Sequence, residues 1–277
     1  MELTSEDAEL SPDARLGRRV RSLREGKGLS LRQLSEKVGG YSHSYLGRVE
    51  LGKQPASAGL IARLDTYFET DGVLAELHGL AQDVLVARYS RHFVRKERDS
   101  LRIQVFTSSV IPGLLQTKEY AHELFRTGLP ASSADQLSVK VDARLNRQGI
   151  FDRDEPPYYW AIMDEASLRR PTRDKGIMKR QLEHILAFSE RSRVTVQVLP
   201  FDQGFHPMLG GSLTLLTLKD GGRAALVESF DSGDVVESPR QIVDLVQRFD
   251  IACAMALPDH ESADLMRRYL EEYTHGG

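Results

Sequence analysis

Three polar side chains occupy one face of a short predicted helix. At helical spacing, His43, Ser44 and Arg48 would face outward, whereas Leu46 and Val49 would be buried. Imidazole, hydroxyl and guanidinium groups can form hydrogen bonds to base edges, and an arginine can bind guanine through two such bonds. We therefore expect His43, Ser44 and Arg48 to read bases from a helix lying in the major groove of double-stranded DNA.

A second set of side chains could contact the phosphate backbone, which fixes the register of a protein on DNA without specifying sequence. These candidates are Arg19, Arg32, Ser42, Tyr45 and Lys53. For any single exposed cation, ordinary solvation explains the residue equally well. The charge of the whole segment therefore has to be considered.

The segment 15–63 is strongly basic within an acidic chain. It holds eleven lysines and arginines against Glu25, Glu36 and Glu50, a net charge of +8, so the −3 of the whole chain leaves −11 for the remainder. Neutralisation of phosphates supplies most of the sequence-independent affinity for DNA. The charge distribution favours a separate polyanion-binding module, with a solvated helical face as the alternative.

The elements that would position these residues are predicted to be helices. Ser30, Ser42 and Ser57 each precede an apolar stripe and are typical N-cap residues. A tight glycine-containing turn, Gly39-Gly40, separates the second helix from the third. We expect a flexible acidic tail at 1–13, an all-α domain at 14–70 and a connecting helix at 71–98.

The stretch LGRRVRSLREGKGLSLRQLSEKVGGYSHSYLGRVELGKQP resembles the xenobiotic-response-element family of phage-repressor-like helix-turn-helix proteins. This resemblance implies that the helix beginning after Ser42 is the recognition helix. It also implies a structural salt bridge between Arg24 and Glu50. The chain departs from the family pattern at Leu31, where many members have a glutamine that donates to a phosphate, and Arg32 could supply that contact instead.

The rest of the chain, 99–277, is predicted to form an α+β domain. Alternating or continuous apolar runs at 158–163, 194–198, 213–218 and 224–227 predict strands, and Asp220-Gly221-Gly222 predicts a hairpin turn between the last two. Helical stripes recur at 137–150, 178–188 and 242–256. The expected fold class is therefore an all-α helix-turn-helix bundle followed by an α+β domain.

This second domain resembles the antitoxin-like, Scr1-type domain of unknown function that follows such a helix-turn-helix in many actinobacterial regulators. The residues that carry the resemblance are 111–117 (IPGLLQT), 143–148 (ARLNRQ), 164–170 (DEASLRR) and 256–258 (ALP). The resemblance implies a regulator that responds to a signal or a partner, because relatives are often encoded beside a very small protein that opposes or tunes them.

Arg144, Arg147 and Gln148 are polar residues three and four positions apart on one predicted helix. Two interpretations remain open for them. They could brace Asp164 or Glu165 within the fold, since intramolecular ion pairs are common, or they could line a pocket for an acidic ligand or partner.

The sequence contains no His-Glu-x-x-His zinc motif, no Gly-x-Ser-x-Gly nucleophile motif, no Gly-x-x-x-x-Gly-Lys-Ser/Thr phosphate-binding loop and no Gly-x-Gly-x-x-Gly after a strand. The eight histidines are scattered and Cys253 is the only cysteine, so we expect no metal site and no cofactor. His206 with Glu228, Asp231 and Asp234 is the one place where a hydrolytic site could form, although a turn with solvated acids explains the same residues. We expect a protein that is not an enzyme.

Taken together, these features predict a cytoplasmic DNA-binding transcriptional regulator that acts as a homodimer, because a single short recognition helix seldom gives sufficient affinity. The N-terminus lacks the features of a signal peptide, and no apolar run approaches the ~20 residues needed to span a membrane. The alternative is an antitoxin-like protein that mainly binds a small cognate protein and uses DNA binding for autoregulation.

Overall fold

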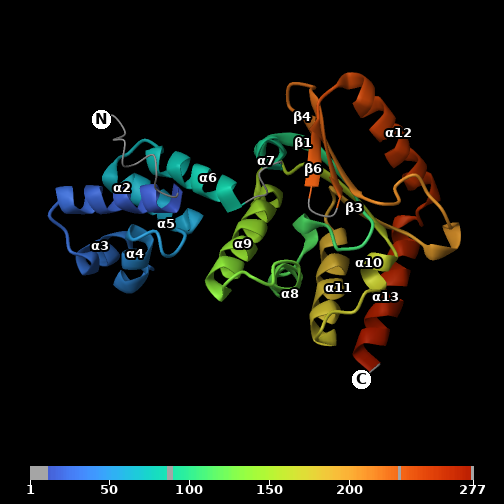
Figure 1. The fold of residues 1–277 in the computed structure, drawn as a ribbon, viewed down its shortest axis with the longest axis horizontal. Helices are drawn as coiled ribbons and strands as arrows, with labels where there is room; N and C mark the ends of the chain where they lie inside the picture. Colours follow the sequence, from blue (N-terminus) through green and yellow to red (C-terminus); the bar gives the residue numbers. More distant parts are fainter. Residues whose placement is uncertain (1–11, 86–89, 230–231, 276–277) are drawn as a thin grey trace. The chain divides into compact units, whose positions relative to one another are not determined.

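The computed structural model describes residues 12–85, 90–229 and 232–275, and the chain divides into two compact units, 1–86 and 87–277 (Figure 1). Most of the acidic segment 1–13 lies outside the described residues. The expected connector, 71–98, contributes to both units, because its first helix belongs to the N-terminal unit and its second helix to the C-terminal unit. Residues 86–89, between these helices, also lie outside the described residues.

The N-terminal unit is a bundle of five described helices. They are α2 (Pro12–Gly26), α3 (Leu31–Val38), α4 (His43–Glu50), α5 (Ala58–Phe68) and α6 (Val73–Leu85). Each contributes apolar side chains to one core, and the fully buried members include Leu16, Leu34, Leu46, Leu60 and Leu74. This all-α bundle agrees with the fold expected from the helical periodicity.

The starts of three helices follow directly from their capping residues. The hydroxyl oxygens of Ser30, Ser42 and Ser57 accept hydrogen bonds from backbone N–H groups in the first turns of α3, α4 and α5. Each bond satisfies a donor that the helix itself leaves unpaired. At Ser30 the side chain of Gln33 also accepts from the Ser30 N–H, which completes a capping box.

Helices α2 and α4 approach each other so closely at Gly17 that no larger residue fits. A Cβ atom at this position would lie 2.3 Å from the carbonyl oxygen of Val49 and 2.7 Å from that of Glu50. Since both neighbours are backbone atoms, a side chain could be accommodated only by separating the two helices.

We expect Gly17→Ala to lower the free energy of unfolding of the N-terminal unit by about 1–3 kcal/mol, through overpacking at the α2–α4 contact. Thermal unfolding followed by far-UV circular dichroism would measure the change. Gly26→Ala is the matched control, because it lies on the same helix and a Cβ there meets nothing within 4 Å. Equal midpoints for the two variants would contradict the close-contact explanation.

The C-terminal unit contains a six-stranded mixed sheet with helices on both faces. Its strands are β1 (Ser100–Thr107), β2 (Tyr158–Asp164), β3 (Val194–Leu199), β4 (Ser212–Leu218), β5 (Arg223–Ser229) and β6 (Ser232–Val236). Its α-helices are α7 (Arg91–Arg98), α8 (Lys118–Gly128), α9 (Ala134–Asn146), α10 (Ala166–Arg169), α11 (Lys175–Ser189), α12 (Pro239–Met255) and α13 (Asp259–His275). Its short 3-10 helices are η2 (Gly113–Leu115), η3 (Arg147–Asp152) and η4 (Phe201–Gln203).

The strand order in this sheet is β3-β2-β1-β4-β5-β6. Strand β1 pairs in parallel with β2 and β2 in parallel with β3, whereas β1 is antiparallel to β4, and β4, β5 and β6 form an antiparallel meander. Gly221, with φ 82°, lies in the hairpin turn between β4 and β5 that the sequence predicts.

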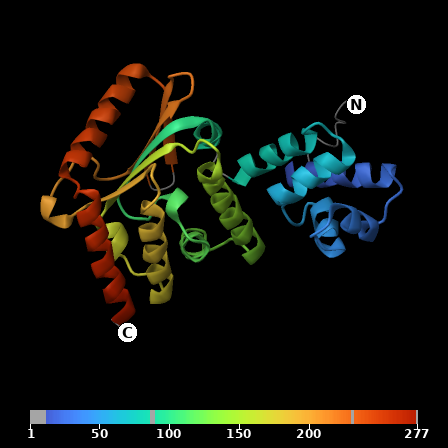
Figure 2. The ribbon, with the colours of Figure 1, turned by 180° about the vertical axis from the view of Figure 1, so that it is seen from behind.

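Alternating side chains of the strands form two separate cores. On β2, Tyr159, Ala161 and Met163 contribute to the larger core, which also contains α11 and α13, whereas Ile162 faces the opposite side and packs with Phe249 of α12. Figures 1 and 2 show α12 on one face of the sheet and α11 and α13 on the other. The α+β fold class predicted for this half of the chain is therefore confirmed.

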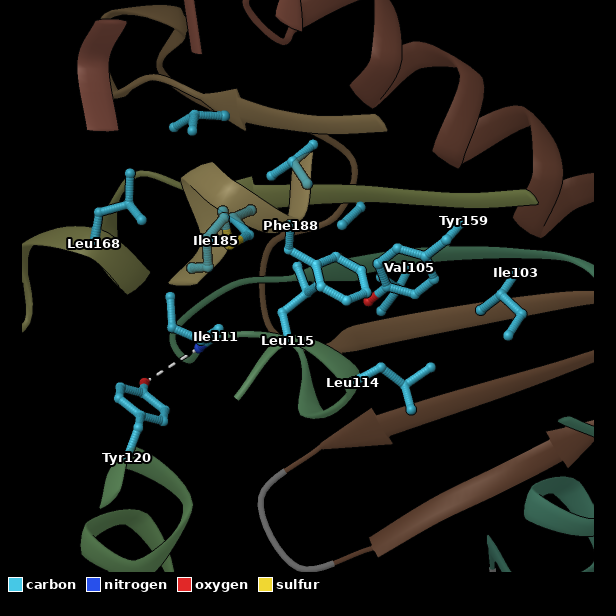
Figure 3. Close-up of a cluster of buried hydrophobic side chains, with 14 of the residues drawn as sticks. Ile103, Val105, Ile111, Leu114, Leu115, Tyr120, Tyr159, Leu168, Ile185 and Phe188 are labelled. Carbon is cyan, nitrogen blue, oxygen red and sulfur yellow. Dashed lines mark hydrogen bonds between the residues drawn. The ribbon is translucent and has the colours of Figure 1, made fainter. Parts of the chain in front are cut away.

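The apolar segment 111–116 is part of the larger core. Ile111, Leu114 and Leu115 are buried among side chains of the sheet and of α11, and the Tyr120 hydroxyl accepts a hydrogen bond from the Ile111 N–H at 3.2 Å (Figure 3). The buried Gln116 side chain donates to the Ile111 carbonyl at 2.7 Å. These contacts explain why the segment has a fixed path although only the short 3-10 helix η2 lies within it.

Candidate nucleic-acid interface

Helices α3 and α4 are short and are joined by a tight turn. The turn residues Gly39 and Gly40 have φ values of 60° and 72°, a region that glycine enters at little cost. The Arg63 side chain, from α5, donates to the carbonyl oxygens of Val38 and Gly39 at 3.0 and 2.8 Å. It thereby satisfies carbonyls at the end of α3 and fixes the turn that orients α4.

The exposed face of α4 carries the candidate base-reading residues. His43, Ser44 and Arg48 are all exposed, whereas Leu46 and Val49 on the opposite face are buried. The Arg48 Nε–H donates to Gln54 Oε1 at 2.6 Å. The helix thus displays an imidazole, a hydroxyl and a guanidinium on one solvent-facing surface. The contact with Gln54 was not predicted from the residue pattern.

Among the candidates for phosphate contacts, Arg32 and Lys53 are exposed and Arg19 is partly buried. Arg32 lies in the first turn of α3, and Lys53 follows the end of α4. Both cations therefore lie on the solvent-exposed surface of the helix-turn-helix.

The other two phosphate candidates make contacts within the bundle. The Ser42 hydroxyl caps α4 by accepting from the Tyr45 N–H at 3.2 Å. The Tyr45 hydroxyl donates to the Pro55 carbonyl at 3.1 Å and accepts from the Ser57 N–H at 2.9 Å, and its ring stacks on that of Tyr41. Tyr45 therefore holds the segment after α4 against the recognition helix, a structural role that the sequence did not indicate.

Arg24 and Glu50 form a two-bond ion pair between α2 and α4. Nε of Arg24 lies 2.7 Å from Oε1 of Glu50, and Nη2 lies 2.8 Å from Oε2. Arg24 Nη1 also donates to the Leu29 carbonyl at 2.7 Å. The side chains are only 11% and 4% exposed, and hydrogen bonding to Glu50 raises the pKa of Arg24 above its ordinary value. The pair fixes the C-terminal end of α4 relative to α2.

Leu31, which departs from the family pattern, packs against the recognition helix. Its side chain is partly buried, and its Cδ1 lies 3.3 Å from the position that a Cβ of Gly47 would occupy. An apolar side chain at this position therefore contributes to the α3–α4 contact.

In the C-terminal unit, Arg144, Arg147 and Gln148 all brace the fold. Arg147 donates to both oxygens of Glu97, from Nε at 2.9 Å and from Nη2 at 2.8 Å. Arg144 donates to the Gln116 side chain at 3.0 Å, and Gln148 donates to the Gln116 carbonyl at 2.7 Å. The expectation that they would brace Asp164 or Glu165 is wrong for Arg147, because the carboxylate that reaches its guanidinium comes from α7.

His206, the histidine considered for a hydrolytic site, forms a buried polar pair with Asp164. Its Nε2 lies 3.1 Å from Oδ2 of Asp164, and its Nδ1 accepts from the Met208 N–H at 3.3 Å. Both ring nitrogens therefore hold the 206–208 loop. Asp231 lies outside the described residues.

Burial raises the pKa of the Cys253 thiol, the only cysteine of the chain, to about 11. In the part of the chain that the structure describes, no group of three or more potential metal ligands occurs.

A hollow of about 450 Å³ in the C-terminal unit is lined by acidic and apolar side chains. Its charged lining consists of Glu165, Asp202, Glu261, Asp264 and Arg268. None of the three candidate pocket residues, Arg144, Arg147 and Gln148, contributes to it.

Across the described ranges, no helix has the length and apolar character required to cross a membrane.

Comparison with known families assigns both halves of the chain. Residues 15–77 match a helix-turn-helix domain, and residues 90–268 match a domain of unknown function, DUF5753. No curated protein and no solved structure matches the chain significantly. Because the second match covers more than half of the chain, the protein belongs to the DUF5753 family, with an N-terminal helix-turn-helix of the xenobiotic-response-element type.

Proposed function

We propose that this DNA-binding regulator recognises a specific sequence through His43, Ser44 and Arg48 of α4, with Arg19, Arg32 and Lys53 holding the phosphate backbone. The observation that carries the proposal is the solvent-facing surface of α4, where these three side chains are exposed on a helix whose opposite face is buried. The net charge of +8 over 15–63 supports it, since a basic surface supplies affinity for any DNA.

Arg48→Ala and Lys53→Ala should have different effects on DNA binding. The full-length protein would first select a target from a pool of randomised duplexes, and affinities for the selected and a scrambled duplex would then be measured over a range of salt concentrations. We expect Arg48→Ala to reduce discrimination between the two duplexes by ~1–3 kcal/mol. Lys53→Ala should weaken binding to both similarly and reduce the salt slope by about one.

These two variants are matched, because each removes one exposed cation near the C-terminal end of α4. If Arg48→Ala weakened binding to both duplexes equally, Arg48 would be a phosphate contact and not a base reader. If Lys53→Ala altered the preferred sequence, its assignment to the backbone would be wrong.

The C-terminal unit is proposed to mediate homodimerisation and to receive a partner or ligand signal. Two recognition helices bound to half-sites about one helical turn apart would compensate for the small surface that one α4 offers. Sedimentation of the full-length protein alone and on the selected duplex would test this proposal. A monomer at all concentrations, bound to an asymmetric single site, would contradict it.

An alternative function is antitoxin-like binding of a small cognate protein encoded nearby, with DNA binding for autoregulation. The observation that favours it is the hollow lined by four carboxylates, together with the net charge of −11 outside 15–63, both of which suit a basic partner. Co-purification from the native cell would identify the partner. Charge reversal at Glu261 should then abolish the complex, whereas unchanged binding would exclude this surface as the docking site.

A further inference from the structure

We propose that Gln54 is a positioning residue, which holds the Arg48 guanidinium so that its two terminal nitrogens point toward a guanine. This inference rests on the proposed function, in which Arg48 reads a base. Its basis is the hydrogen bond from Arg48 Nε to Gln54 Oε1 at 2.6 Å, between two side chains six residues apart at the edge of the exposed α4 surface.

The contact with Gln54 determines which edge of the guanidinium remains available. An arginine has five N–H donors in a planar fork, and it can bind a planar acceptor pair either side-on, through Nε and one terminal nitrogen, or end-on, through both terminal nitrogens. Arg24 binds Glu50 side-on, through Nε and Nη2. In Arg48 the Nε–H is already engaged, so the end-on edge is the one left for the O6 and N7 acceptors of guanine.

The backbone around Gln54 is itself held in place, which lets its side chain act as a fixed support. The Lys53 and Gln54 N–H groups both donate to the Arg48 carbonyl, at 2.9 and 3.3 Å. Gly52 has a φ of 64°, and a Cβ there would lie 2.7 Å from Cα of Ala14, so the turn after α4 passes directly against α2. Beyond Gln54, the Pro55 carbonyl accepts from the Tyr45 hydroxyl.

The neutral amide of Gln54 suits this role better than a carboxylate would. Its oxygen orients the guanidinium without cancelling the positive charge that attracts DNA. Orienting the side chain before binding also reduces the conformational entropy that binding would otherwise remove. We therefore expect Gln54 to contribute to discrimination at the base that Arg48 reads, and to make no separate contribution elsewhere on the duplex.

The experiment measures base preference in a double-mutant cycle with the full-length protein. Competition among duplexes drawn from a selected randomised pool would give the preference at each position for the unaltered protein, Arg48→Ala, Gln54→Ala and the double variant. The position whose preference Arg48→Ala abolishes identifies the base that Arg48 reads. Replacing that guanine by 7-deazaguanine removes the N7 acceptor and tests whether Arg48 donates to that atom.

We expect Gln54→Ala to reduce the preference at that position about 3- to 10-fold, the range that ordering one long side chain accounts for. It should cause no further loss in the Arg48→Ala background, and it should reduce the penalty of 7-deazaguanine. Gln54→Glu keeps an acceptor oxygen, so it should retain the preference at that position while weakening binding to every duplex. The thermal unfolding midpoints of all variants should remain within a few degrees of each other.

The outcomes separate this inference from the proposed function. If Arg48→Ala abolishes a base preference and Gln54→Ala leaves it intact, Arg48 is a base reader and the positioning role of Gln54 is wrong. If Gln54→Ala weakens binding equally with and without Arg48, Gln54 contacts DNA independently, which also overturns the inference. If Arg48→Ala changes no base preference, both the proposed reading role and the inference are wrong.

Discussion

Arg24→Ala should lower the free energy of unfolding of the N-terminal unit by about 3–5 kcal/mol, because it leaves the Glu50 carboxylate buried without its partner. The Glu50 side chain is only 4% exposed, and both of its oxygens accept from Arg24. For a unit of this size, such a loss corresponds to a decrease of more than about 10 °C in the unfolding midpoint. Far-UV circular dichroism of the full-length protein would follow the helical transition.

Arg21→Ala is the matched control for this prediction, since Arg21 lies on the same helix and pairs with Glu25 at 2.8 Å, with both side chains more than half exposed. Exposed pairs of this kind contribute about 0–1 kcal/mol. The double variant Arg24→Met with Glu50→Leu should recover part of the loss, because no charge then remains buried. A similar small loss for Arg21→Ala and Arg24→Ala would mean that water solvates Glu50 once Arg24 is removed.

The fold of the N-terminal unit could be predicted from the sequence because its signals are local. Ser30, Ser42 and Ser57 each begin a helix through contacts that span three residues, and helical periodicity selects the buried side chains without knowledge of the rest of the fold. The pairing of Arg24 with Glu50 joins residues 26 positions apart. Only the family resemblance, not the periodicity, indicated that contact.

The candidate interface was predicted less completely, because two of its contacts depend on the path of the chain after α4. The Tyr45 hydroxyl is engaged by Pro55 and Ser57, and Arg48 is engaged by Gln54. The segment that supplies these partners has no periodic pattern. From the sequence alone, Tyr45 on α4 and Gln54 in the segment that follows could equally be solvent-exposed side chains without a partner in the fold.

In the C-terminal unit, apolar runs located four of the six strands and missed β1 and β6. Strand β1 does carry the signal, since Ile103 and Val105 are buried and alternate with the less buried Arg102 and Gln104. Strand β6 is short and contains Gly233 and Asp234, both unfavourable in strands, so pairing with β5 decides its structure. The partners of Arg144, Arg147 and Gln148 could not be predicted, because tertiary folding alone brings Glu97 of α7 and Gln116, which follows η2, to them.

Arg147→Ala should destabilise the C-terminal unit by about 3–5 kcal/mol and leave the N-terminal unit little changed. Glu97 is only 2% exposed, and its two oxygens accept from Nε and Nη2 of Arg147. Burial lowers the pKa of Arg147, but the Glu97 carboxylate more than offsets this effect and raises it above the ordinary value. The only tryptophan, Trp160 on β2, makes its fluorescence a specific reporter of unfolding in this unit.

Arg267→Ala is the control, because Arg267 pairs with Asp264 at 2.7 Å on the surface, with side chains 58% and 62% exposed. The Trp160 transition should shift by about 10 °C for Arg147→Ala and hardly at all for Arg267→Ala. If Arg147 instead served mainly to bind a ligand, its removal would leave this transition in place. Because Glu97 belongs to α7 and Arg147 to η3, the same ion pair also holds α7 against the segment that follows α9.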